Sequence, residues 1–262
     1  MFQLTPTVKA LLIMNLVIFV MTNFIFPEAM QQFALYGFQS DKFRGYQLFT
    51  HMFLHAGWGH IFSNMFSLFI FGPMLEYRWG GNRFLVFYLV CGLGASLLYQ
   101  GIRTYEIMDM KKDVAVYAEN PSPLAFSQFL DEHLGGRYNP EAVAQYKREA
   151  DNQEMVQATI ESVKSVYNDL VQNGKMVGAS GAVFALLMAF GMLFPNTELM
   201  LLFFPFPIKA KYFVLFYGAY ELYAGLARNP GDNVAHFAHL GGMLFAYILL
   251  KIWERHDRKN FY

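Results

Sequence analysis

Residues 178–195 read GASGAVFALLMAFGMLFP, an apolar stretch without a charged residue that opens with a serine between small residues. As a helix it would span about 27 Å at 1.5 Å per residue, slightly less than the roughly 30 Å hydrocarbon core of a bilayer. The small residues Gly178, Ala179 and Gly181 around Ser180 have two interpretations. They allow two helices to touch, or they leave room for a substrate beside a reactive hydroxyl.

The composition of the whole chain favours a membrane protein. Of its 262 residues, 55% are hydrophobic and only 15% are charged, which is more apolar and less charged than a soluble globular domain. The net charge of zero gives no reason to expect nucleic acid as a partner. A single cysteine, Cys91, excludes a framework of intrachain disulfides. The lipid bilayer is therefore the expected surrounding of this chain.

Six apolar segments are candidates for membrane-spanning helices, because a span needs about 20 mostly apolar residues. They are residues 8–26, 57–76, 83–102, 178–195, 211–228 and 234–253. The sequence thus predicts an all-α, multi-pass integral membrane protein, a bundle of six transmembrane helices. No small-residue cleavage site follows the first segment, so we expect it to be retained. The aromatic-rich residues 27–56 are expected at the membrane interface, and "LMLLFFPFPIKAK" (199–211) as a loop partly dipped in lipid.

Residues 103–177 differ sharply from the rest and divide the chain into residues 1–102, a soluble insert and residues 178–262. The insert holds 12 of the 20 acidic and 8 of the 20 basic residues. Ser122-Pro123 predicts the start of a helix and Gly135-Gly136 its end. A second helix is predicted from Asn139-Pro140 to Asn173-Gly174. The expected insert is therefore helical and lies between the third and fourth spans.

One face of that second predicted helix carries an apolar stripe. Its members recur at helical spacing: Val156, Ile160, Val163, Tyr167 and Leu170. Such a stripe must cover something. Packing on a neighbouring helix of the insert is favoured over a partner site.

The positions of lysine and arginine in short loops predict the orientation of the chain. The loops and tail on one side carry Arg78, Arg83, Lys209, Lys211, Lys251, Arg255, Arg258 and Lys259, and the loops on the other carry Lys42, Arg44 and Arg228. This bias predicts that both termini are cytoplasmic. The insert and the start of residues 178–195 are then on the outer side.

Five of the seven histidines lie in or beside apolar segments, where ionisable side chains are functional candidates by default. They are His51, His55, His60, His236 and His239. Two pairs have the spacing of one helix face, but no carboxylate accompanies them in a pattern such as HExxH. We therefore predict no metal site, and we expect His51, His55 and His236 to be hydrogen-bonded structural residues. No aspartate falls within the six spans, which leaves an intramembrane aspartyl mechanism without an acid.

A nucleophile with a base is the third arrangement that these residues allow. Ser180 lies at the first turn of its span, and a serine hydroxyl needs a base to remove its proton. His239 lies near the outer end of 234–253, at a similar depth. Free backbone N–H groups at a helix N-terminus suit a tetrahedral oxyanion. His60 and Asn64, one turn apart, could add side-chain donors.

Four motifs together resemble the rhomboid intramembrane serine proteases. They are HMFLHAGWGHIFSNMFSLFIFGPMLE (51–76), GASGAVFALL (178–187), PFPIKAK (205–211) and AHFAHLGG (235–242). The resemblance covers roughly residues 40–102 and 176–250. It implies a six-helix fold with Ser180 as nucleophile, His239 as base and no cofactor. It also implies an oxyanion hole of His60, Asn64 and the Ser180 backbone N–H, with Phe184 packed on His239.

The implied reaction is hydrolysis of peptide bonds in or near transmembrane segments of other membrane proteins, and a bacterial inner membrane is the expected location. Two features depart from the family: Ala246 stands where the sixth span often has glycine, and the long insert is not part of the shared core. No acid accompanies the motifs to orient His239, so packing on Phe184 is expected to hold its ring. The alternatives are a catalytically silent rhomboid-like protein that binds transmembrane clients, and a transporter. The transporter has less support, because no inverted repeat is clear.

Overall fold

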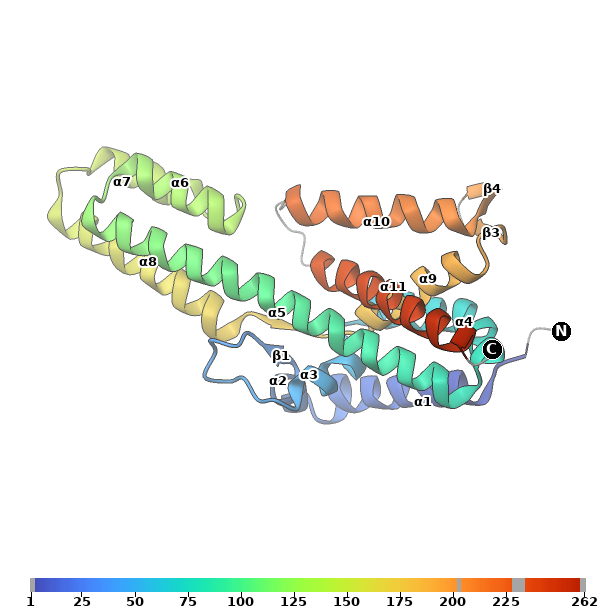
Figure 1. Ribbon diagram of the computed structural model, residues 1–262. Helices are drawn as coiled ribbons and strands as arrows, with labels where there is room; N and C mark the ends of the chain where they lie inside the picture. Colours follow the sequence, from blue (N-terminus) through green and yellow to red (C-terminus); the bar gives the residue numbers. More distant parts are fainter. Residues whose placement is uncertain (1–2, 202–203, 228–233, 260–262) are drawn as a thin grey trace.

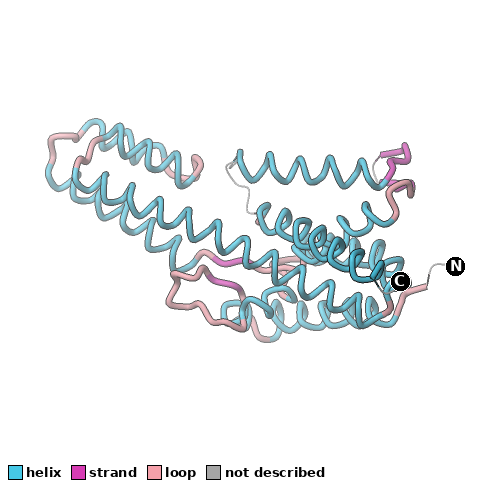
Figure 2. Tube along the Cα trace, viewed as in Figure 1, coloured by secondary structure: helices cyan, strands magenta, loops and turns pink. Residues whose placement is uncertain are grey.

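The computed structural model describes residues 3–201, 204–227 and 234–259 as a mainly helical protein (Figures 1 and 2). Its longer helices are α1 (Pro6–Val20), α4 (Trp58–Trp79), α5 (Gly81–Glu119), α6 (Pro123–Leu134), α7 (Pro140–Arg148), α8 (Gln153–Asn173), α9 (Ser180–Leu193), α10 (Ala210–Ala227) and α11 (His236–Lys259). Shorter helical turns are the π-turn η1 (Met21–Ile25), α2 (Glu28–Phe33), α3 (Gln47–Thr50) and the 3₁₀ turn η2 (His51–Phe53). Two small antiparallel sheets pair β1 (Leu35–Tyr36) with β2 (Lys175–Met176), and β3 (Glu198–Leu201) with β4 (Phe204–Lys209).

Three of the described helical segments are long and apolar enough to cross a membrane. They are Pro6–Ile25, Gly81–Glu119 and His236–Glu254. Helices α4 and α10 occupy the second and fifth predicted segments without meeting this criterion, and the fifth segment ends at residue 228, outside the described residues. Helix α9 has 14 residues, or about 21 Å at 1.5 Å per residue. The mainly helical fold is as predicted, while the count of six crossings stays a prediction.

Helix α9 lies at the centre of the main apolar core, against α4, α5, α10 and α11 (Figure 1). Its buried small residues Ala182, Ala185 and Ala189 allow neighbouring helices to come close. At Gly242 of α11, an added Cβ would overlap the carbonyl oxygen of Gly181. Ala246 is fully buried in the same core. The first interpretation of the small residues around Ser180 therefore holds for Gly181, because α9 and α11 touch there.

The start of α1 is held by a carboxylate from α4. Glu76 accepts hydrogen bonds from the backbone N–H of Thr7 and of Val8, both at 2.9 Å, and one from the Thr5 hydroxyl at 2.5 Å. These bonds satisfy donors that the first turn of a helix leaves free.

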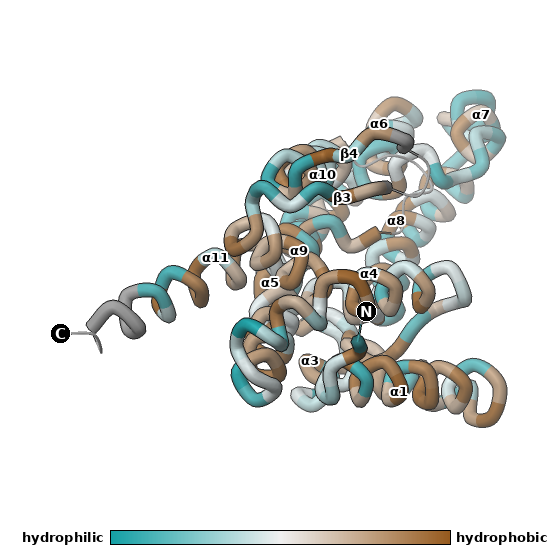
Figure 3. The backbone as a smooth tube through the Cα atoms, turned by 90° about the vertical axis from the view of Figure 1, so that its right-hand side faces the viewer, coloured by the Kyte–Doolittle hydropathy of each residue, from teal (hydrophilic) through white to brown (hydrophobic). Residues whose placement is uncertain are grey.

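Apolar residues run along α1, whereas polar residues are frequent around α7 (Figure 3). This contrast separates a part suited to lipid from a part suited to water.

Helix α5 continues well beyond the predicted span 83–102. Its distal half packs against α6 and α8, and α7 packs on these two helices (Figure 1). As predicted, α6 begins after Ser122, whose hydroxyl accepts from the Ala125 N–H at 3.2 Å, and ends at Gly135 with a φ of 54°. The prediction of one helix from 140 to 173 is wrong. α7 ends at Arg148, and Asn152 caps a new helix by accepting from the Glu154 N–H at 2.9 Å.

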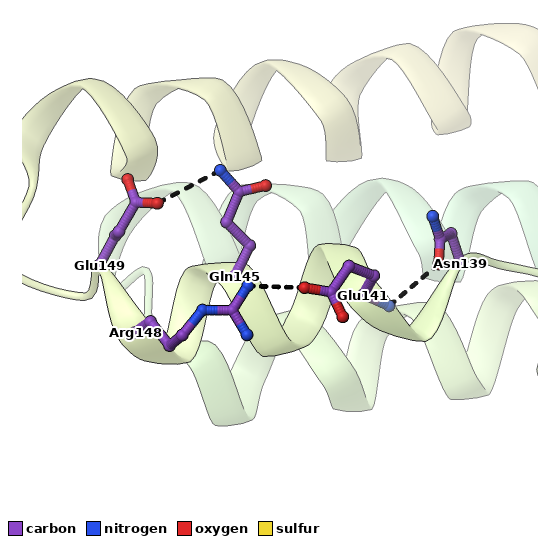
Figure 4. A network of polar contacts seen from close by, with 5 residues as sticks. All are labelled: Asn139, Glu141, Gln145, Arg148 and Glu149. Atoms are coloured by element: carbon purple, nitrogen blue, oxygen red, sulfur yellow. Dashed lines mark hydrogen bonds and ion pairs between the residues drawn. The ribbon is translucent and has the colours of Figure 1, made fainter.

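Surface contacts along α7 show how this short helix is held (Figure 4). The Asn139 side chain accepts from the Glu141 N–H at 3.0 Å, and Arg148 pairs with the Glu141 carboxylate at 2.6 Å. Gln145 donates to Glu149 at 3.3 Å. Asn139 thus caps the helix at its start, as Asn152 caps α8.

The predicted apolar stripe of α8 packs inside the insert. Ile160 and Val163 are buried, and Val156, Tyr167 and Leu170 are partly buried against a cluster formed with α5, α6 and α7. Packing on neighbouring helices is therefore confirmed for this stripe.

Two loop predictions need correction or detail. Within 199–211, where a loop was expected, strands β3 and β4 pair antiparallel, with Glu198 opposite Lys209; residues 202–203 lie outside the described residues. Residues 27–56 contain α2, α3, η2 and strand β1, which pairs with β2 just before Ser180. Strand β1 of this segment thus supports the chain that leads into α9.

Candidate active site

Ser180 is the first residue of α9, and backbone hydrogen bonds hold the segment of chain that leads to it. In β2, Met176 lies opposite Leu35 of β1. Two residues later, the Gly178 N–H donates to the carbonyl oxygen of His51 at 2.9 Å. The Ser180 hydroxyl is thereby placed at the N-terminal end of a buried helix, where backbone N–H groups lack helical partners.

His60 and Asn64 approach the same turn from α4. Gly178 has a φ of +122°, and a Cβ at that position would lie 2.5 Å from Nε2 of His60 and 3.7 Å from Nδ2 of Asn64. Nδ2 of Asn64 is buried without a hydrogen-bond partner in the described part of the chain. Two side-chain nitrogens therefore converge beside the turn that precedes Ser180, and only glycine leaves them this space.

His239 lies one turn into α11 and stacks on Phe184 of α9. The two rings are 4.1 Å apart at their centroids with 7° between their planes. Both residues line the same cavity as Ser180, His60 and Asn64, a hollow of about 1420 Å³. Among the described residues, no hydrogen bond joins the Ser180 hydroxyl to His239; that ring bonds to a carboxylate instead. In sites without substrate such bonds are often long or poorly aligned.

That carboxylate is Glu221 of α10, a residue that the sequence analysis did not single out. Its Oε2 accepts from Nδ1 of His239 at 2.8 Å and from Nδ1 of His236 at 2.6 Å. Its side chain is only 3% exposed. The expectation that no acid accompanies the motifs is therefore wrong. An acid inside the apolar segment 211–228 was the signal available in the sequence, because such residues are functional candidates.

Two clusters offer three metal-binding atoms within 4.8 Å of one another in the described residues: Glu221, His236 and His239, and on the insert Asp113, Glu132 and His133. The first cluster contains Glu221, so the absence of a carboxylate is no longer an argument against a metal site at these histidines. The hydrogen bonds from His236 and His239 to Oε2 of Glu221 are enough to explain why these ligand atoms lie close together. The second is partly exposed, and His133 is hydrogen-bonded to Asp113 at 2.9 Å.

His51 and His55 fill different roles from each other. His51 is buried between the Gln47 carbonyl oxygen at 2.8 Å and the Ser96 hydroxyl at 3.0 Å, as expected of a structural residue. The ring nitrogens of His55 have no partner in the described chain, so the hydrogen bonding predicted for it is not found. Its ring instead lies edge-on to His60, 5.1 Å away. Burial lowers the pKa of His51 to about 4, and burial with the nearby His60 lowers that of His55 to about 3.

Comparison with known proteins assigns this chain to a family. The Rhomboid domain matches residues 42–108 and 155–255, more than half of the chain. The chain belongs to the rhomboid family. The match omits residues 109–154 and includes residues 103–108 and 155–177 of the predicted insert, whose bounds stay a prediction. All the predicted site residues lie inside the matched rhomboid segments.

Plant rhomboid-like proteins are among its relatives. A segment of 53 residues is 43% identical to Rhomboid-like protein 11, chloroplastic, of Arabidopsis thaliana, covering 20% of this chain and 19% of that protein. A segment of 120 residues is 32% identical to RHOMBOID-like protein 12, mitochondrial, of the same plant, covering 44% of this chain and 34% of that protein. The similarity thus spans at most about a third of the length of these relatives.

Proposed function

We propose that this rhomboid is an active serine endopeptidase that cleaves other membrane proteins in or near their transmembrane segments. One observation carries the proposal. Ser180 and His239 lie on helices whose backbones touch at Gly181 and Gly242, and both line one cavity. A rhomboid-like protein that only binds transmembrane clients, without catalysis, would not need a hydroxyl and an imidazole in the same cavity.

In the proposed reaction, Nε2 of His239 takes the proton of Ser180 as the hydroxyl oxygen attacks the peptide carbonyl carbon. The carbonyl oxygen becomes an oxyanion, which accepts from the Ser180 N–H, His60 and Asn64. The imidazolium then gives its proton to the leaving amine, and water hydrolyses the acyl-enzyme. Nδ2 of Asn64, buried without a partner in the described chain, fits this role because a free donor needs no rearrangement.

The length of α9 supports a submerged site open to water. At about 21 Å it is too short for a bilayer core of about 30 Å, so its first turn can lie below the outer surface. Polar side chains at membrane depth are tolerated where they line a cavity. We propose six crossings, with both termini cytoplasmic and a bacterial inner membrane as the location.

The insert, residues 103–177, is proposed to lie outside the membrane and to influence access of substrates. The cavity that contains Ser180 is also lined by insert residues, among them Glu132, His133 and Arg137. A transmembrane substrate that reaches Ser180 through this opening would therefore meet α6.

Cleavage of a transmembrane substrate in liposomes tests the proposal. Ser180→Ala should abolish cleavage, whereas Ser162→Ala, an exposed serine on α8, should not. Loss of one oxyanion donor in Asn64→Ala should lower the rate on the order of a hundredfold. A chelator should have no effect. Chelator-sensitive cleavage that survives Ser180→Ala would favour a metal at Glu221, His236 and His239. A folded wild type without cleavage would favour the silent client-binding alternative.

A further inference from the structure

Glu221 is a site residue to which the rhomboid resemblance gives no role. It comes from α10, while the two imidazoles that it contacts come from the first turn of α11. The side chains of His236 and His239 are 8% and 9% exposed, and that of Glu221 is 3% exposed. A carboxylate this buried requires partners, because desolvation of an unpaired charge is costly.

The two hydrogen bonds fix where the imidazole protons are. An ionised carboxylate only accepts hydrogen bonds, so Nδ1 of each histidine must be the donor. In a neutral imidazole one nitrogen carries the proton and the other keeps a lone pair. His239 bound in this way therefore has its proton on Nδ1 and a free lone pair on Nε2. A base that receives the proton of Ser180 needs that lone pair.

We infer that Glu221 is the positioning residue of His239, so that the site works as a Ser–His–Glu arrangement rather than a pair held by stacking alone. This inference rests on the proposed function. Phe184 restricts the plane of the ring, but stacking cannot select which nitrogen is protonated. The hydrogen bond to Glu221 selects it and fixes the rotation of the ring within that plane.

The carboxylate also balances charge during the reaction. When the O–H bond of Ser180 breaks, its proton moves to Nε2 and His239 becomes an imidazolium. Glu221 stays ionised and offsets this charge until the proton passes to the leaving amine. The acids Glu106 of α5 and Glu132 of α6 also line the cavity, but among the described residues Glu221 is the acid hydrogen-bonded to His239. Glu221 therefore supplies the charge beside the imidazolium.

Exchange of Glu221 for glutamine separates positioning from packing. The amide has the same size but no negative charge. Both imidazoles share Oε2 in the structure, so the amide oxygen can replace it as acceptor of both bonds, and the charge next to His239 is lost. In the Ser-His-Asp template, a carboxylate-to-amide change leaves the wrong tautomer and lowers kcat about 10⁴-fold. Here Phe184 still holds one ring face, so we expect Glu221→Gln to lower kcat on the order of 100-fold, with KM little changed. Glu221→Asp should recover part of this loss.

The tautomer itself is measured on wild-type protein by ¹⁵N NMR of labelled histidines in detergent, with His239 assigned from His239→Gln. We expect protonated Nδ1 and unprotonated Nε2 in the wild type, and a loss of this pattern in Glu221→Leu, whose side chain offers no acceptor. Glu198→Gln, an exposed glutamate of β3, is the matched control and should change neither kcat nor the spectrum.

A wild-type His239 protonated on Nε2 would overturn the inference, even if Glu221→Gln did not fold. So would a folded Glu221→Gln variant with unchanged kcat. Failure of the proposed function gives a different result: either the folded wild type does not cleave, or Ser180→Ala cleaves as well as the wild type, whatever the tautomer of His239.

Discussion

The ring of His239 lies parallel to the ring of Phe184, with centroids 4.1 Å apart and 7° between the planes. Phe184 is on the helix that begins with Ser180, so the same helix carries the proposed nucleophile and one wall for the proposed base. The ring of Phe184 also contacts that of Tyr217, with centroids 4.9 Å apart. The ring of His239 is therefore held by stacking on α9 and by the carboxylate of Glu221 on α10.

Replacing Phe184 with leucine should lower kcat more than it lowers stability. Leucine keeps an apolar side chain but offers no flat face to the imidazole, which gains freedom to rotate. We expect a loss on the order of tenfold in kcat, since a misplaced reacting group is costly. Phe190→Leu is the matched control on the same helix, where the ring contacts Phe71 at 5.0 Å. Equal losses of kcat in both variants, at equal thermal stability, would contradict the role given to the stack.

Gly242→Ala should separate α9 from α11. The added methyl group would overlap the carbonyl oxygen of Gly181, a backbone atom that cannot move aside alone. Overpacking of this kind costs about 1–3 kcal/mol, and we expect both a lower unfolding temperature and a loss of cleavage. Gly101→Ala in α5 is the control, because nothing lies within 4 Å of its added Cβ. A Gly242→Ala protein with wild-type activity would show that this close approach is not needed.

Stability should fall as the pH is lowered below about 6.5. Burial lowers the pKa of His51 to about 4 from an unfolded value of 6.5. Between these values the unfolded chain binds a proton that the folded protein does not, so stability is full above pH 6.5 and decreases towards pH 4. His51→Gln, which cannot titrate, should show a smaller decrease of the unfolding temperature between pH 7 and pH 5. An identical decrease in both proteins would contradict this assignment.

Removal of residues 107–169, with a short Gly/Ser linker, should leave a folded core with altered preference among substrates. This deletion keeps Leu170, whose carbonyl accepts from Arg103 at 3.1 Å, and Gln172, which contacts Ser40. The proposed reason is that α6 lines the cavity of Ser180. Arg148→Ala, on the surface of α7, should have no effect, since exposed ion pairs contribute little. Unchanged relative rates for several substrates in the deletion variant would refute the access role.

Much of the fold could be predicted because local sequence determines it. The apolar segments predicted where the long helices lie. Ser122 and Gly135 predicted the two ends of α6. The interruption between α7 and α8 was missed, since Asn152 was not recognised as a second helix cap. The β3–β4 hairpin was missed because a proline-rich apolar stretch does not alternate as a strand with one solvated face does.

The candidate site was predictable in its motifs but not in its third member. Ser180, His60, Asn64 and His239 form a recognisable pattern, whereas Glu221 lies 18 residues before His239 and contacts it only through the packing of α10 on α11. Sequence spacing shows neighbours on one helix, and it cannot show a contact between two helices. An acidic residue inside an apolar segment was the available clue.

Covalent labelling by a fluorophosphonate probe tests the central claim most directly, because the probe reacts with a serine only where a base and an oxyanion site activate it. We predict one adduct on the full-length protein, located by mass spectrometry at Ser180 and absent from Ser180→Ala. Ser162→Ala should be labelled like the wild type. An adduct at another residue, or equal labelling of Ser180→Ala, would contradict the claim that Ser180 is the nucleophile of this rhomboid.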